Sequence, residues 1–238
     1  MALPNLNNDV PKYELTVPST QEVVKYRPFL VKEQKVLMIA YESQEPKQII
    51  TAMMDCINNC VTGIERIQDL ATFDIDYIFT QIRSKSVGET SKVLLKCKQC
   101  ETENEVNIDL SNIGKNMEYP ETIIPLTDTI QIEMKYPTYM DLLKTNLISQ
   151  ENPSMTDILF ENLYTCLGSV KTEEENVSIK DEPKEEINNF INNLTNDQLE
   201  KLQGFVQNLP TLKENVNFKC KECESDETME LSGLQDFF

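Results

Sequence analysis

The chain has 238 residues, a hydrophobic content of 39% and a formal net charge of −18, from 22 Lys and Arg against 40 Asp and Glu. This length and apolar content support one large domain or a domain that carries an insertion. The acidic balance argues against direct binding of nucleic acid, because neutralising phosphates requires clustered basic side chains.

Two residue types are scarce in a way that excludes whole classes of active site. The chain has no histidine, which excludes Ser-His-Asp and Cys-His nucleophilic sites and histidine metal ligands. Its 6 glycines are far apart in the sequence, so neither G-x-G-x-x-G nor a phosphate-binding P-loop can form. Only carboxylate or lysine chemistry remains for an enzyme. We therefore predict a protein that is not an enzyme and has no small-molecule substrate.

The sequence lacks the usual signals for membranes and secretion. It has no run of about 18 apolar residues, and its first residues, MALPNLNNDV, lack the basic and apolar regions of a signal peptide. We therefore expect a soluble protein without membrane contact in a reducing compartment. Under those conditions, paired cysteines are expected to bind a metal rather than form disulfides.

The N-terminal third predicts a β-hairpin followed by three helices. Alternating apolar residues indicate two strands between residues 11 and 27. Two helices are expected from Lys32 and from Pro46, where a proline suits the first turn, and Asp74 is placed to cap the third. The positions expected to face the core are Val36, Ile39 and Ala40 in the first helix and Ile75, Ile78, Phe79 and Ile82 in the third.

Two stretches share one pattern: VLLKCKQCETENEVNIDL at 93–110 and VNFKCKECESDETMEL at 216–231. In each, an apolar run enters a C-x-x-C turn and a second strand-like run leaves it, which predicts a hairpin with two thiolates at its tip. Two such hairpins facing each other make the four-sulfur tetrahedral site that zinc accepts. We therefore predict one structural Zn²⁺, bound by Cys97, Cys100, Cys220 and Cys223.

The predicted zinc site leaves alternatives open. Between Cys100 and Cys220 lie 119 residues, far more than the usual zinc-ribbon spacing, so an insertion must separate the two pairs. Two reduced hairpins without metal, or two separate disulfides, would also fit the pattern. A thioredoxin-type site is disfavoured, because its C-x-x-C begins a helix rather than joining two strands. The remaining cysteines on predicted helices are interpreted as core residues, and these are Cys56, Cys60 and Cys166.

The segment between the hairpins is predicted to be mainly helical. After a strand within 129–136, helical periodicity begins at Pro137. Helices are expected at 139–147, 155–167, 184–194 and 196–209. Residues 171–186 carry seven acidic residues against three lysines, which predicts a solvated loop or, alternatively, an acidic docking segment.

These elements together predict an α+β fold. It would consist of an N-terminal β-hairpin with helices, split zinc-ribbon-like hairpins, and a helical bundle inserted between them. The domains expected are an N-terminal lobe with the first zinc knuckle at 1–136, a helical insertion at 137–210, and the second knuckle with the C-terminal tail at 211–238.

Three blocks of the N-terminal third form a combined pattern: LTVPST at 15–20, YRPFLVKEQKVLMIA at 26–40 and DIDYIFTQIRSKSVGE at 74–89. The pattern resembles the baseplate hub proteins of T4-like contractile-tailed bacteriophages. The resemblance covers roughly residues 10–140. It implies a structural component or assembly chaperone of the tail baseplate hub, made in the host cytoplasm and contacting other hub or wedge proteins.

The matching blocks also nominate a partner-binding surface. Its residues are Arg27, Phe29, Lys32, Glu33, Arg83, Lys85, Ser86 and Glu89. The alternative is that these side chains pair within the chain, between the hairpin and the third helix; arginine suits either use through its planar, bidentate donors. A hypothesis of another class is a zinc-containing acidic adaptor or regulatory protein that binds host machinery.

Overall fold

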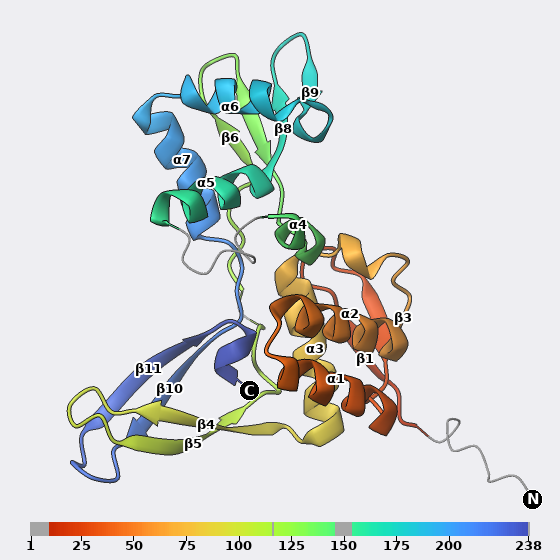
Figure 1. Ribbon diagram of the computed structural model, residues 1–238, viewed down its shortest axis with the longest axis vertical. Helices are drawn as coiled ribbons and strands as arrows, with labels where there is room; N and C mark the ends of the chain where they lie inside the picture. The colour runs from red at the N-terminus through yellow and green to blue at the C-terminus, as the bar shows by residue number, and fades with distance from the viewer. Residues whose placement is uncertain (1–9, 116, 146–153, 238) are drawn as a thin grey trace, which may run out of the picture. The chain divides into compact units, whose positions relative to one another are not determined.

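The computed structural model describes residues 10–115, 117–145 and 154–237. The chain divides into two compact units (Figure 1): one combines Met1–Met117 with Thr211–Phe238, and the other is Glu118–Pro210. The fold class is α+β, as the sequence predicts. The first unit is therefore built from both ends of the chain, and the second is inserted between them.

The N-terminal part of the first unit combines a small sheet with three helices. Its elements are β1 (Tyr13–Thr16), β2 (Val23–Tyr26), α1 (Val31–Ser43), α2 (Pro46–Cys60), β3 (Val61–Thr62), a 3₁₀ turn (Ile67–Asp69) and α3 (Thr72–Val87). The predicted hairpin is β1 paired antiparallel with β2, and β3 adds a short third strand beside β2. The predicted helices from Lys32 and Pro46 are confirmed as α1 and α2.

Helices α2 and α3 both contribute buried apolar residues to the core of this part. The predicted stripe of α3 is confirmed, because Ile75, Ile78, Phe79 and Ile82 are all buried. Cys56 and Cys60 of α2 are buried as well, which confirms their interpretation as core residues. The spacing of three and four residues places these side chains on one face of each helix.

Helix α1 differs from the expectation. Its buried positions are Glu33, Leu37 and Ala40, whereas the predicted core residues Val36 and Ile39 are exposed. Apolar residues surround much of this helix, so periodicity alone could not identify the buried face. The carboxylate of Glu33 lies on the buried side of α1, and its Oε1 accepts a hydrogen bond of 2.9 Å from Arg27 Nη2.

The side chain of Asp74 links the turn between β1 and β2 to α3. Its carboxylate accepts hydrogen bonds from the backbone N–H of Ser19 (2.8 Å), the hydroxyl of Ser19 (2.5 Å) and the N–H of Ala71 (3.2 Å). The helix begins at Thr72, two residues before the predicted start, so Asp74 caps it from the third position. Burial raises the pKa of Asp74.

The two cysteine stretches form the hairpins that the sequence predicts. The first comprises β4 (Thr90–Lys96) and β5 (Glu103–Asp109), and the second β10 (Lys213–Lys219) and β11 (Asp226–Ser232). A final 3₁₀ turn, Leu234–Phe237, follows β11. Side chains of both hairpins share one hydrophobic cluster, and its buried members are Val93, Leu95, Ile108, Leu110, Ile113, Leu212, Val216, Leu231 and Phe237.

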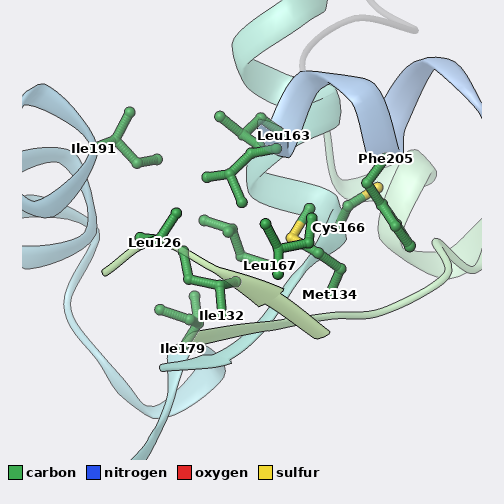
Figure 2. Close-up of a cluster of buried hydrophobic side chains, with 11 residues drawn as sticks. Leu126, Ile132, Met134, Leu163, Cys166, Leu167, Ile179, Ile191 and Phe205 are labelled. Atoms are coloured by element: carbon green, nitrogen blue, oxygen red, sulfur yellow. The ribbon is translucent and has the colours of Figure 1, made fainter. Parts of the chain in front are cut away.

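The second unit packs helices against a four-stranded antiparallel sheet of order β6-β7-β8-β9. Its elements are β6 (Ile123–Pro125), β7 (Gln131–Met134), α4 (Tyr139–Lys144), α5 (Met155–Cys166), β8 (Leu167–Lys171), β9 (Asn176–Ser178), a 3₁₀ turn (Ile179–Asp181), α6 (Lys184–Asn192) and α7 (Asn196–Gln207). Figure 2 shows how strand and helix side chains meet in one core, where Ile132 and Leu163 have no exposed surface. Cys166 lies in this core, as predicted.

Two expectations for this region are wrong. The insertion is not a helical bundle starting at 137, because β7 pairs with β8 and the inserted unit therefore begins at Glu118. Residues 171–186 are not a solvated loop: they include the end of β8, the edge strand β9 and the start of α6. Strand β9 has one apolar residue, Val177, and lies between acidic stretches of the chain, so the local sequence does not reveal its strand character. The end of the predicted helix at 139–147 lies outside the described residues.

Candidate metal centre

The two cysteine turns have the same backbone conformation. The N–H of Cys97 donates to the carbonyl of Thr102 (3.0 Å), and the N–H of Cys220 donates to that of Ser225 (2.9 Å). The residue after each second cysteine adopts a left-handed conformation, with φ of 58° at Glu101 and 56° at Glu224. Each turn therefore presents its two sulfurs on the same side of a hairpin tip.

The four sulfurs converge from the two hairpins. The Sγ atoms of Cys97 and Cys223 are 3.6 Å apart, as are those of Cys100 and Cys220, and all four lie within 4.8 Å of one another. A disulfide requires sulfurs about 2 Å apart, so none of these contacts is a disulfide. A tetrahedral zinc with Zn–S bonds of about 2.3 Å would separate its sulfurs by about 3.8 Å. The cysteines therefore have the spacing to hold a metal ion.

Hydrogen bonds around the two sulfurs of the second hairpin, those of Cys220 and Cys223, favour thiolates over thiols. Backbone hydrogen bonds from Cys223 and Glu222 lower the pKa of Cys220 to about 6, and hydrogen bonds with Ser225 lower the pKa of Cys223. The N–H of Gln99 points at the sulfur of Cys97 at 3.4 Å. Because the thiolate is the form that ligates metals, these contacts prepare the site for a cation.

A second layer of contacts crosses from one hairpin to the other. Asn104 and Glu227 occupy equivalent positions, each seven residues after the first cysteine of its pair. Asn104 Nδ2 lies 3.7 Å from Cys220 Sγ, and Glu227 Oε1 lies 3.5 Å from Cys97 Sγ. Asn104 Oδ1 also accepts the N–H of Lys221 at 2.9 Å. Each hairpin thus contacts the other hairpin's first sulfur.

Asn104 and Glu227 were not identified from the sequence. Aligning the two stretches on their cysteines would have shown that the two residues are equivalent. Strand alternation also places Asn104 on the face of Ile108 and Glu227 on the face of Leu231, so the sequence carried a signal that both side chains turn inward. In the structure both residues are buried.

The ligand set favours a closed site. Four cysteine side chains fill a tetrahedral coordination sphere, which leaves no position for water or substrate. Among the residues that the structure describes, this is the one group of cysteine, aspartate or glutamate side chains close enough to hold a metal. The chemistry of such a centre is structural cross-linking rather than catalysis.

Comparison with known protein families identifies the family of the chain. The model of the T4 bacteriophage base plate protein family matches residues 10–238, which is nearly the whole chain. The chain belongs to this base plate protein family. The resemblance to T4-like baseplate proteins seen in the N-terminal blocks is thereby confirmed, and the match extends through the insertion and the second hairpin. Comparisons with curated proteins and with solved structures gave no match.

In this base plate protein, several residues of the predicted partner surface make contacts within the chain. Arg27 donates to Glu33 and, at 2.9 Å, to the carbonyl of Asn59. The hydroxyl of Ser86 accepts the N–H of Phe29 at 2.9 Å and so joins α3 to the segment before α1. These residues hold the N-terminal elements together.

The other residues of the predicted surface are more accessible. Lys32 is exposed, and Lys85 forms an ion pair with Glu89 at the end of α3. Arg83 is half-buried beside Phe29, and burial lowers the pKa of its guanidinium. Lys32, Lys85 and Glu89 therefore remain the members of this set that a partner could reach.

Within the three described ranges, no helix is long and apolar enough to cross a membrane.

Proposed function

We propose that this base plate protein is a structural component or assembly factor of the baseplate hub of a T4-like phage, acting through protein–protein contacts without enzymatic activity. The observation that carries the proposal is the family match over residues 10–238. Its partners would be other hub or wedge proteins. It would be made in the host cytoplasm and work on the tail baseplate.

We propose further that Cys97, Cys100, Cys220 and Cys223 bind one structural Zn²⁺. Support comes from their sulfur spacing, within 4.8 Å, and from the absence of histidine and the all-sulfur ligand set, which suit zinc. The metal would join β4–β5 to β10–β11 and so hold the two chain segments of the first unit together. The zinc would serve the assembly role by keeping the first unit in one shape.

The function is tested by removing the gene from the phage. Tails should fail to assemble around the hub, and the tagged protein should co-purify with hub or wedge proteins from infected cells. Normal tails without the gene, or no co-purifying tail protein, would contradict the proposal. Retention of host polymerase from uninfected extract would instead support the adaptor hypothesis.

Mass spectrometry of purified virions distinguishes a stable baseplate component from a transient assembly factor. A stable baseplate component should be present in intact particles. A transient assembly chaperone should be missing from particles yet present on hub intermediates. The same samples would show which tail proteins accompany it.

A further inference from the structure

The outer face of α1 is apolar and lacks cover from its own unit. Val31, Met38 and Ile39 are 65%, 54% and 66% exposed. Beside this face, a hollow of about 340 Å³ lies between α1 and α2, lined by Val36, Ile39 and Ala52 among others. Single exposed apolar residues are ordinary on protein surfaces, but several on one helix face mark a contact surface.

On this face, the charged side chains of Lys35 and Glu42 flank Met38 and Ile39. Lys35, Met38 and Glu42 follow one another at spacings of three and four residues, so they lie along one stripe of the helix. Lys35 and Glu42 are two turns apart, with Met38 and Ile39 between them. The stripe is therefore basic at one end, apolar in the middle and acidic at the other end.

We propose that this α1 face, defined by Lys35, Met38, Ile39 and Glu42, binds the same face of a second copy of the chain in an antiparallel arrangement. With a two-fold axis beside Met38 and Ile39, Lys35 of each copy lies opposite Glu42 of the other. Met38 and Ile39 then pack against their counterparts. Such an isologous contact closes on itself and yields a dimer.

Charge favours a second copy as the occupant. The net charge of −18 opposes association of two copies through most of their surface. On the outer side of α1, by contrast, basic and acidic side chains are present together in an order that is self-complementary when reversed. Glu33 does not disturb this order, because it is buried and paired with Arg27.

The size of the face predicts a weak dimer. A helix of 13 residues is about 20 Å long, so two such helices bury less area than a standard stable interface. We expect association to depend on concentration. The mass of the zinc-loaded full chain should rise from 27.4 kDa toward twice that value as concentration increases.

Sedimentation velocity over a range of concentrations tests the dimer. Ile39→Glu should hold the protein at the monomer mass, since it places a charge at the centre of the apolar contact. Leu94→Glu is the matched control, because Leu94 is 67% exposed on β4 rather than on α1, and this change should leave association unchanged. Melting curves show that both variants are folded.

A charge exchange tests the arrangement itself. Lys35→Glu and Glu42→Lys should each weaken the dimer by about fivefold, the size expected for two surface ion pairs. The double variant should recover the original affinity, since both ion pairs return with reversed polarity. A wild-type protein that stays monomeric at every concentration, or a double variant no better than the singles, would overturn the proposal.

Discussion

At the scale of single residues, Asn104 and Glu227 occupy equivalent positions in the two hairpins but are expected to have opposite effects on metal affinity. Asn104 donates toward a sulfur, whereas Glu227 places a carboxylate 3.5 Å from Cys97 Sγ. Four thiolates around Zn²⁺ leave an excess of negative charge, so Glu227→Gln should raise zinc affinity about tenfold, and Asn104→Asp should lower it by a similar factor.

Competition with a chromophoric chelator measures both zinc affinities. Glu230→Gln is a suitable control, because Glu230 lies on the same strand but pairs with Lys213 at the surface. Unchanged affinity in Glu227→Gln would show that its carboxylate does not influence the sulfur.

The left-handed residues of the two turns give a second prediction. Glu101 has φ of 58°, a conformation that costs a side-chain-bearing residue about 1–2 kcal/mol. Glu101→Gly should therefore leave the free energy of unfolding unchanged or raise it by up to about 1 kcal/mol, while Glu101→Val should lower it by about 1–3 kcal/mol.

Denaturant unfolding of the zinc-loaded protein measures this difference. Glu103→Val serves as the reference, because Glu103 is exposed on β5 with ordinary strand geometry. If valine were equally tolerated at both positions, the conformation of the turn would have to be different.

The buried ion pair between Arg27 and Glu33 gives a pH dependence. Burial acts to raise the pKa of Glu33, but hydrogen bonds from Arg27 and from the N–H of Leu30 outweigh it and lower the pKa below its usual value. A lowered folded-state pKa stabilises the protein above the unfolded-state pKa, and this stabilisation is lost as pH falls through the folded-state pKa.

Wild-type protein should therefore lose more stability than Glu33→Gln on acidification below about pH 5. At pH 7, Glu33→Gln should already be about 1–3 kcal/mol less stable, because Arg27 loses its charged partner. Melting temperatures at pH 7, 5 and 4 give the comparison. Parallel curves for the two proteins would contradict a lowered pKa of Glu33 in the folded state.

At the scale of elements, Gly168 allows β8 to approach β7. A Cβ at this position would meet the carbonyl oxygen of Glu133 at 2.6 Å, beside the irregularity in the strand pairing at Glu133 and Met134. Gly168→Ala should therefore destabilise the inserted unit by about 1–3 kcal/mol. Thermal unfolding followed by circular dichroism measures the loss.

Gly204 is the matched control for this substitution. It lies within α7, and an added Cβ would meet nothing within 4 Å. Gly204→Ala should stabilise the helix by about 0.5–1 kcal/mol, because alanine loses less conformational freedom than glycine. The two alanine variants should thus shift the unfolding transition in opposite directions, and a stabilising Gly168→Ala would contradict the close approach of the strands.

The elements that the sequence predicts well are those with strong local signals. Helix α2 starts at its proline and ends at Cys60 as expected, and the cysteine hairpins follow directly from their repeated pattern. Strand β8 was missed because its character depends on pairing with β7, a partner more than thirty residues away. Strand β9 has a single apolar residue, Val177, within an acidic segment, so local composition favours a loop.

At the scale of the whole molecule, the sequence predicts the four cysteines of the candidate metal site but not the boundary of the unit inserted between them. Residue type and spacing identify the four cysteines, because few other arrangements use two C-x-x-C turns. The boundary of the inserted unit at Glu118 depends on a sheet assembled from distant strands, and such long-range pairing leaves little trace in any single stretch.

The insertion of one unit between the halves of another would make the proposed zinc important for the structure. Residues 118–210 separate β10–β11 from the rest of the first unit in the sequence. Folding of the first unit therefore has to bring two distant segments of the chain together. Loop closure is costly in conformational entropy, and structural zinc contributes on the order of 10 kcal/mol in small domains. Cys97→Ser or Cys220→Ser should therefore lose the metal and lower the melting temperature by more than 10 °C, by an order-of-magnitude estimate.

The zinc content of the purified full chain tests the central claim most directly. Elemental analysis of protein prepared without added metal should give about one zinc per chain in the wild type. The Cys97→Ser and Cys220→Ser variants should contain little or none, while Cys166→Ser, which changes a core cysteine outside the site, should retain it. A wild-type protein that is folded and contains no zinc would contradict the account.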